Sequence, residues 1–294
     1  MDKELIRFLN SVEWSIDPMW GFSQLKNYIL NYKQVSDGVF SKEDIFTANK
    51  NKSGIIYFNN GVGNSFQANV WDLDFSEVPP GSTAVLTFSG VMRNEDGLCS
   101  YGVNSYNNAL YALYDNANVA GIEYRVSSGG GESSSGHSMA AAIKDRNKPV
   151  VVVSDFLGSA AIMGTSTADA IYASHRGSQF GSIGSYISID KELLAEYKET
   201  MMDFYAEQST EKNADFRKAL EGDFSLIISK ATKNASVFHT EYLKNRALTE
   251  KYKDETLKGG MFYYADAKRR GLVDGVATRS EIQNIIKKQL KYYK

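Results

Sequence analysis

Cysteine, histidine and long apolar runs are all scarce in this chain of 294 residues. A single cysteine, Cys99, has no partner for an intramolecular disulfide bond, which agrees with a reducing compartment. The three histidines, His137, His175 and His239, lie far apart in sequence without acidic or cysteine ligands at close spacing, so we expect no metal site. No apolar run approaches the ~18–20 residues of a membrane span, and the charged N-terminus does not resemble a signal peptide. We therefore expect a cytoplasmic location.

Charge is also nearly balanced, at a formal net value of −2. Surfaces that bind nucleic acid normally carry a basic excess, so none is expected here. The basic stretch 281–294 is predicted to be a C-terminal helix whose basic residues form a solvated face. The apolar fraction of 43% and the charged fraction of 23% are typical of a globular protein, long enough for one large α/β domain or two smaller ones.

Residues 81–280 show alternating strand and helix patterns, which indicate a domain with a parallel sheet and flanking helices. In such sheets ligands gather at the carboxyl ends of the strands. The expected strands are 84–88, 119–126, 150–154 and 170–173, and the expected helices between them are 104–114, 135–144 and 160–168.

Residues 1–80 have a different pattern and form a predicted, mostly helical N-terminal extension. Apolar spacing indicates two amphipathic helices within the first 35 residues, and Ile55 to Phe58 reads as a strand. Pro79-Pro80-Gly81 marks the boundary with the next domain. A lid, an oligomerisation arm and a partner-docking segment all remain open as the role of this extension.

A serine and a lysine are the candidate chemical groups. Ser159, in Gly158-Ser159-Ala160-Ala161, follows a predicted strand, and Lys212 lies 53 residues downstream. A serine hydroxyl needs a neighbouring base to become a nucleophile, and a lysine serves as that base where burial disfavours its charged form. Taken singly, Ser159 fits a helix N-cap and Lys212 a solvated surface charge.

The glycine run Ser127-Ser128-Gly129-Gly130-Gly131 ends the predicted strand 119–126. It lacks the pattern of a nucleotide-binding loop or of a dinucleotide site. Glycines let a backbone N–H approach a reacting carbonyl, as an oxyanion hole requires, but a plain turn fits the same residues.

Taken in order, these segments resemble the signal peptide peptidase A / phage protein C family of serine peptidases, over about residues 83–278. The similar pieces are the strand ending in the glycine run, Lys148-Pro149 before a strand, Gly158-Ser159-Ala160-Ala161, Gly181-Ser182-Ile183-Gly184, Ser209 to Asn213, and the closing Gly271-Leu272-Val273-Asp274. The family has a ClpP/crotonase-like fold, which is the fold that the resemblance implies here.

By this resemblance Ser159 is the nucleophile, Lys212 is the base and Ser182 orients the lysine amine. The oxyanion hole is implied to consist of the backbone N–H groups of Gly130 and Ala160. The chain departs from the family at Ser128, where proline is usual, and at Ala160 and Ala161, where glycines are usual. These departures put the shape of the oxyanion hole in question.

The resemblance also implies a homo-oligomeric ring that acts on a peptide or protein substrate without a cofactor, nucleic acid or membrane. Relatives of this size without an anchor act as prohead proteases on phage scaffold and capsid proteins, which adds the phage prohead to the expected locations. A signal peptide peptidase-like enzyme that degrades peptides is an alternative. Two further alternatives are an acyl-CoA enzyme of crotonase type, which has no need for Ser159 or Lys212, and a degenerate peptidase kept as an assembly subunit.

Overall fold

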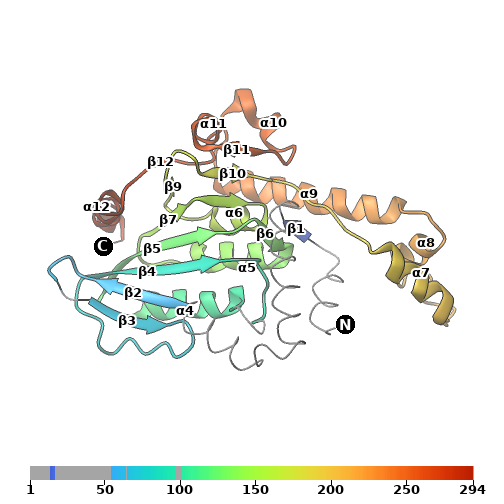
Figure 1. The fold of residues 1–294 in the computed structure, drawn as a ribbon, viewed down its shortest axis with the longest axis horizontal. Helices are drawn as coiled ribbons and strands as arrows, with labels where there is room; N and C mark the ends of the chain where they lie inside the picture. Colours follow the sequence, from blue (N-terminus) through green and yellow to red (C-terminus); the bar gives the residue numbers. More distant parts are fainter. Residues whose placement is uncertain (1–13, 17–53, 64, 97–100, 294) are drawn as a thin grey trace, which may run out of the picture.

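The computed structural model describes residues 14–16, 54–63, 65–96 and 101–293. The two helices expected in the first 35 residues lie outside this part, as does Cys99. The central sheet (Figure 1) is built from β2 (Ile55–Asn59), β3 (Ser65–Asn69), β4 (Ser82–Ser89), β5 (Val119–Ser127), β7 (Val150–Ser154), β9 (Ala170–Ala173) and β12 (Gly275–Val276).

The strand order of this sheet is β12-β9-β7-β5-β4-β2-β3. The neighbours from β4 to β12 pair in parallel, whereas β2 and β3 extend the sheet with antiparallel pairing. Parallel neighbours need crossover connections, and the predicted helices provide them. The predicted α/β fold, a mostly parallel sheet with flanking helices, is therefore confirmed. Of the extension 1–80, the described residues contribute the strands β2 and β3 and one short strand near the N-terminus.

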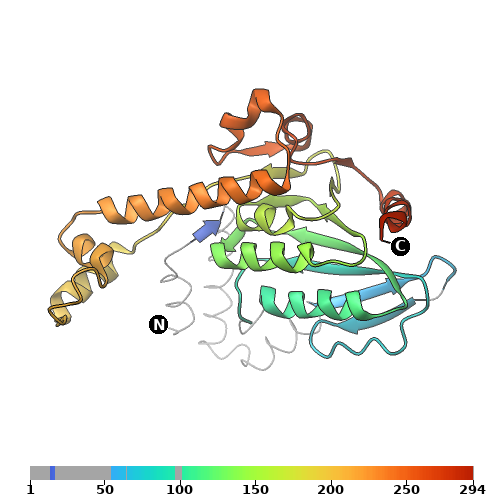
Figure 2. The same ribbon diagram turned by 180° about the vertical axis from the view of Figure 1, so that it is seen from behind.

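Helices cover both faces of the sheet. On one face lie α4 (Val103–Asp115), α5 (Ser133–Lys144) and α6 (Ala160–Thr165), and α12 (Arg279–Gln289) packs on the other (Figures 1 and 2). Successive side chains of a strand point to opposite faces. Val150 and Val152 accordingly belong to the core under α4–α6, while Val151 packs with Ile282 and Ile286 of α12.

Short strands form two small additional sheets. The first, of order β11-β10-β8, contains β8 (Phe156–Gly158), β10 (Gln179–Gly181) and β11 (Met261–Tyr263). The second pairs β1 (Trp14–Ile16) with β6 (Gly130–Glu132). Both small sheets involve segments in which the sequence patterns predicted no strand, and both lie beside the glycine run and Ser159.

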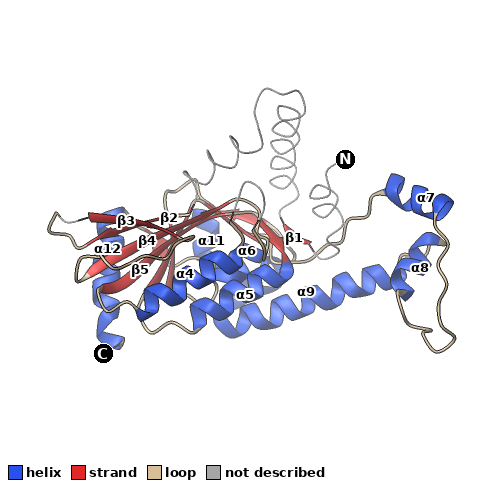
Figure 3. Cartoon of the chain, turned by 90° about the horizontal axis from the view of Figure 1, so that it is seen from below, coloured by secondary structure: helices blue, strands red, loops and turns tan. Residues whose placement is uncertain are grey.

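An arm projects from the body of the molecule (Figure 3). It consists of α7 (Lys191–Thr200), α8 (Ala214–Leu220) and the N-terminal half of α9 (Ser225–Asn245). The C-terminal half of α9 is anchored, because Phe238 and Tyr242 are buried and the amide Nδ2 of Asn245 donates to Ser166 Oγ at 3.0 Å. Across the described residues, no helix combines the length and the apolar character needed to cross a membrane.

Two aspartates secure the far end of the sheet. Asp274 of the closing motif accepts the Ile171 backbone N–H at 2.7 Å, so this motif fixes the pairing of β12 with β9. Asp169 accepts two hydrogen bonds of 3.0 Å from the Arg146 guanidinium and one of 2.6 Å from the Tyr293 hydroxyl. The C-terminal turn is thereby held against the start of β9. The remaining short helices are α10 (Lys253–Thr256), α11 (Tyr264–Arg270) and the 3₁₀ turns Glu250–Tyr252 and Leu290–Tyr292.

Candidate active site

Ser159 lies at the turn between β8 and α6 with φ 53° and ψ −120°. A positive φ is rare for a residue with a Cβ and is costly unless the surroundings enforce it. The side chain occupies the N-cap position of α6 but makes no capping hydrogen bond to that helix, so the helix-cap interpretation does not account for this serine. Hydrolases present a nucleophilic serine on a sharp, strained strand-to-helix turn of this kind.

The glycine run lies directly alongside the strand that carries Ser159. Ser128 pairs with β8 on both sides of Leu157, because its N–H donates to Phe156 O at 2.8 Å and its carbonyl accepts Gly158 N–H at 2.9 Å. A Cβ added to Gly158 would lie 3.4 Å from the carbonyl oxygen of Gly129. The structure therefore brings the predicted oxyanion segment to the residue that precedes the nucleophile.

The segment Gly181-Ser182 borders Ser159 on the other side. The Ser159 N–H donates to Gly181 O at 3.0 Å, and the next residue, Ser182, also has a positive φ, of 54°. Gly181 has φ 142°, and a Cβ there would come within 2.2 Å of Gly260 O, so only glycine fits. Ser182, the predicted base-orienting residue, thus lies next to the nucleophile in space.

The two predicted oxyanion donors differ in their hydrogen bonding. Ala160 is the first residue of α6, where the helix supplies no acceptor for a backbone N–H. The Gly130 N–H instead donates to Ser128 Oγ at 3.1 Å, and that hydroxyl donates to Gly90 O at 2.7 Å. The serine that stands where proline is usual therefore competes for one of the two predicted donors.

Alanines at positions 160 and 161 are accommodated without distortion. Both lie within α6, where a Cβ carries no conformational cost, and both are buried in the main core. Helix α5 comes close to them, since a Cβ on Gly136 would lie 2.6 Å from Ala160 O. The backbone N–H at position 160 is present whether the residue there is alanine or glycine.

Lys212 lies elsewhere in the chain. It is exposed, in the segment between α7 and α8, and its backbone N–H donates to Ser209 O at 3.2 Å. Figures 1 and 3 show α7 and α8 at the end of α9 that is remote from the sheet. A single copy of the chain therefore brings together Ser159, Gly130, Ala160 and Ser182 but leaves Lys212 apart, and the pairing of Ser159 with Lys212 stays a prediction.

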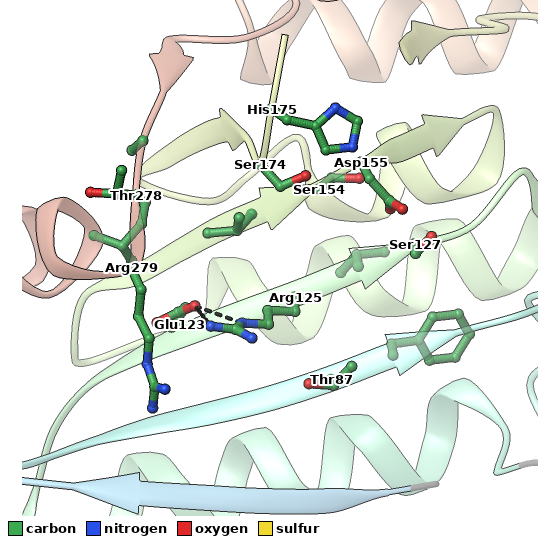
Figure 4. A pocket seen from close by; sticks show the side chains of 15 residues that line it. Thr87, Glu123, Arg125, Ser127, Ser154, Asp155, Ser174, His175, Thr278 and Arg279 are labelled. Carbon is green, nitrogen blue, oxygen red and sulfur yellow. Dashed lines mark hydrogen bonds and ion pairs between the residues drawn. The ribbon is translucent and has the colours of Figure 1, made fainter. Parts of the chain in front are cut away.

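A separate cavity of about 370 Å³ opens on the α12 side of the sheet (Figure 4). Glu123, which is only 1% exposed, binds the Arg125 guanidinium at 2.7 Å through Oε1, while its Oε2 has no partner among the described residues. Figure 4 also shows Asp155 and His175 at the upper rim. Ser159 directly precedes α6, which lies on the opposite face of the sheet, so this cavity is distinct from the Ser159 site.

The serines, His175 and Asp155 of that cavity do not form a catalytic triad. The Nδ1 atom of His175 accepts the Gly177 N–H at 3.1 Å, whereas a triad histidine donates from Nδ1 to its carboxylate. The Ser174 hydroxyl meets Ser178 Oγ at 3.4 Å rather than the imidazole. Ser159 is therefore the better candidate nucleophile.

Comparison with known proteins gives only distant similarities. No family model and no curated protein match the chain. Similar solved structures include a putative enoyl-CoA hydratase from Mycobacterium avium paratuberculosis K-10, with 15% identity over 71% of each chain and a TM-score of 0.42. They also include a point mutant of ClpP1 from Listeria monocytogenes, with 15% identity over 67% of this chain and 92% of that one, at a TM-score of 0.41. A third is a point mutant of the 1510-N membrane-bound stomatin-specific protease, with 12% identity, coverage of 68% of this chain and 82% of that one, and a TM-score of 0.38. These structures include a putative hydratase as well as proteases, so the similarity does not show the activity.

Proposed function

We propose that this protein is a serine endopeptidase whose nucleophile is Ser159 and whose general base is Lys212. The observation that carries the proposal is the strained strand-to-helix turn at Ser159, enclosed between the glycine run and Gly181-Ser182. Ser159 is buried with φ 53°, and its hydroxyl makes no capping hydrogen bond to the helix that it precedes. Nucleophilic attack requires such a hydroxyl, whereas capping does not explain it here.

The proposed chemistry is acyl transfer to Ser159. As Oγ forms a bond to the peptide carbonyl carbon, the neutral Lys212 amine takes the hydroxyl proton and then delivers it to the departing amine as the C–N bond breaks. The Ala160 N–H stabilises the oxyanion, and the Gly130 N–H joins it once its hydrogen bond to Ser128 Oγ is broken. Each such donor contributes ~3–4 kcal/mol. Water activated by the same lysine then cleaves the acyl-enzyme and restores Ser159.

Because Lys212 lies on the arm, apart from Ser159 of the same copy, we propose that the base comes from a neighbouring copy. The arm exposes apolar side chains, including Met202 at 81% and Phe204 at 89% exposure, which an isolated chain leaves in water. In the proposed homo-oligomeric ring these side chains are covered, and Lys212 enters the adjacent Ser159 site, where burial favours its neutral form. Ser182 then orients the amine.

The proposed substrate is an extended polypeptide. The sequence resemblance favours a phage scaffold or capsid protein, with general peptide degradation in the cytoplasm as the alternative. No cofactor takes part in either reaction. The two are separated by offering the assembled protein an unrelated unfolded protein alongside a capsid or scaffold protein encoded by neighbouring genes.

The test is hydrolysis of those substrates by the wild type, Ser159→Ala and Lys212→Ala. We expect both substitutions to abolish cleavage without changing the assembly state. Lys198→Ala is a matched control, because Lys198 is another exposed lysine of the arm, and it should keep full activity. Cleavage that persists in Ser159→Ala or Lys212→Ala would refute the proposed pair. Equal loss in the Lys198 control would show that the arm itself, rather than the Lys212 amine, is required.

A further inference from the structure

The short strand β1 pairs with the strand that follows the glycine run. Residues Trp14–Ile16 lie antiparallel to Gly130–Glu132, with Trp14 opposite Glu132, Ser15 opposite Gly131 and Ile16 opposite Gly130. Figure 1 shows β1 beside β6 at the end of the sheet next to α6. A segment more than 110 residues away in sequence thus occupies an edge that belongs to the Ser159 site.

Strand β6 has one edge turned toward Met92 and a second edge that, within the described part of the chain, pairs with β1. On the first edge, the Gly130 carbonyl accepts the Met92 N–H at 2.9 Å. The Glu132 N–H donates to Met92 O, also at 2.9 Å. Because consecutive peptide groups of a strand point to opposite edges, the N–H and C=O of Gly131 face the other way. That is the side on which Ser15 lies.

This edge is close to the nucleophile. The run that leads into β6 pairs with β8 at Ser128 and Leu157, two residues before Ser159. Ile16 lies opposite Gly130, the predicted oxyanion residue. An extended peptide that adds a strand to an exposed sheet edge binds through backbone hydrogen bonds whatever its side chains. A substrate laid along β6 would meet the position that Trp14–Ile16 holds.

We propose that Trp14–Ile16 is a built-in inhibitor strand, which occupies the substrate-binding edge of β6 until a polypeptide substrate displaces it. The inference rests on the proposed function and adds regulation of the same site. Three residues of the inhibitor strand are paired in the described part of the chain, so we expect it to exchange readily. A longer substrate that makes more backbone hydrogen bonds displaces it from this edge. The occupant of the resting site is a segment of the chain itself.

The experiment compares Ser15→Pro with Ser15→Ala in the assembled full-length protein. Proline removes the N–H opposite Gly131 and disfavours pairing, whereas alanine keeps the backbone donor. If the inhibitor strand holds the edge nine-tenths of the time, its release lowers the apparent KM for a peptide substrate about tenfold without changing kcat. Hydrogen exchange at the Gly131 amide should accelerate in Ser15→Pro alone. A synthetic peptide of residues 11–17 should inhibit Ser15→Pro competitively, and a scrambled peptide should not.

A small fluorophosphonate, which needs no strand edge, separates failure of this inference from failure of the proposed function. If it labels Ser159 equally in all variants while KM and Gly131 exchange do not change in Ser15→Pro, the inhibitor strand is refuted and the peptidase stands. If it labels Ser159 in none of them, the proposed function fails, and loss of Gly131 protection in Ser15→Pro would then support the pairing alone. A lower KM in both Ser15→Pro and Ser15→Ala would also contradict the inference, because alanine retains the pairing group.

Discussion

At the scale of single residues, the backbone of Ser159 is the most informative feature of the chain. A non-glycine residue with φ 53° persists where neighbouring hydrogen bonds fix the backbone, and here the Ser159 N–H is held by Gly181 O. The positive φ and the missing cap bond are the two observations that support Ser159 as the proposed nucleophile.

Replacing Ser159 with glycine should therefore stabilise the protein while abolishing hydrolysis. Glycine adopts a positive φ without the steric cost, so we expect a gain of about 1 kcal/mol over Ser159→Ala, or about 2 °C in Tm. Thermal unfolding of the two variants side by side measures the difference. Equal Tm values would show that the turn at Ser159 stores no strain.

A second prediction concerns Ser128. Its hydroxyl accepts a hydrogen bond from the Gly130 N–H, and the substitution Ser128→Ala frees that N–H to bind the oxyanion. Since one such hydrogen bond contributes about 1 kcal/mol, we expect kcat to rise about fivefold. Stability should fall by a similar amount, because the bond from Ser128 Oγ to Gly90 O is lost as well. Steady-state kinetics and urea unfolding test both halves, and a decrease in kcat would remove Gly130 from the oxyanion hole.

At the scale of elements, β5 carries a buried tyrosine with an unsatisfied hydroxyl. Tyr124 is fully buried in the core under α4–α6, its OH has no partner among the described residues, and burial raises its pKa well above the ordinary value. The core tyrosine Tyr242, whose hydroxyl likewise finds no partner in the described part of the chain, has its pKa raised to about 12, mainly by burial. Each of these buried, unpaired hydroxyls lowers the free energy of unfolding. A phenylalanine at the same position would not carry this penalty.

Tyr124→Phe should accordingly stabilise the protein by about 1 kcal/mol at neutral pH. In the unfolded chain Tyr124 ionises near pH 10, whereas in the folded protein it keeps its proton, so wild-type stability is fully present below pH 10 and falls as the pH rises above it. The phenylalanine variant lacks this contribution and should lose less stability in alkali. Chemical unfolding at pH 7.5 and at pH 11 compares the two, and a destabilised variant at neutral pH would contradict the account.

The larger elements follow from sequence patterns, whereas the site depends on pairing between distant segments. The apolar run Val150 to Val153 and the helical spacing of Tyr106, Leu110 and Leu113 predicted β7 and α4, because each element buries its own regular pattern. The three-residue strands β6, β8 and β10 have no local pattern. Glycine-rich segments of this length become strands only when their partners align, so the strained turn at Ser159 had no local signal.

The sequence predicts which residues belong to the candidate site better than it predicts their contacts in space. The ordered motifs predicted Ser159, Gly130, Ala160 and Ser182 as one site, and the structure places these four together. The bond from the Gly130 N–H to Ser128 Oγ and the pairing of β1 with β6 were not predicted. The first depends on how the glycine run turns, and the second joins backbone groups that carry no residue-type signal. The same limit applies to Lys212, whose distance from Ser159 depends on where the arm lies.

At the scale of the whole molecule, the two residues of the proposed catalytic pair lie on different parts, Ser159 on the body and Lys212 on the arm. The body supplies the proposed nucleophile and oxyanion donors, and the arm supplies the proposed base together with exposed apolar side chains such as Met202 and Phe204. Head-to-tail contacts of this kind close into rings when the rotation between copies permits it. In the proposed ring, each site would combine the serine of one copy with the lysine of the next.

Shared sites predict complementation between inactive variants. Ser159→Ala and Lys212→Ala, co-assembled in equal amounts, should regain about a quarter of wild-type activity, because that fraction of sites combines an intact serine with an intact lysine from the next copy. Unmixed variants assayed at the same total concentration should stay inactive. No recovery in mixed assemblies, shown to be mixed by native mass spectrometry, would exclude sharing of the pair between copies.

The most direct measurement of the central claim is the site of covalent reaction with a fluorophosphonate. The assembled wild type is treated with the reagent, digested and analysed by mass spectrometry. We predict one modified residue, Ser159, with no adduct in Ser159→Ala, much slower labelling in Lys212→Ala and unchanged labelling in Lys198→Ala. An adduct on another serine, or an assembled wild type that does not react at all, would contradict the assignment of Ser159 as the nucleophile.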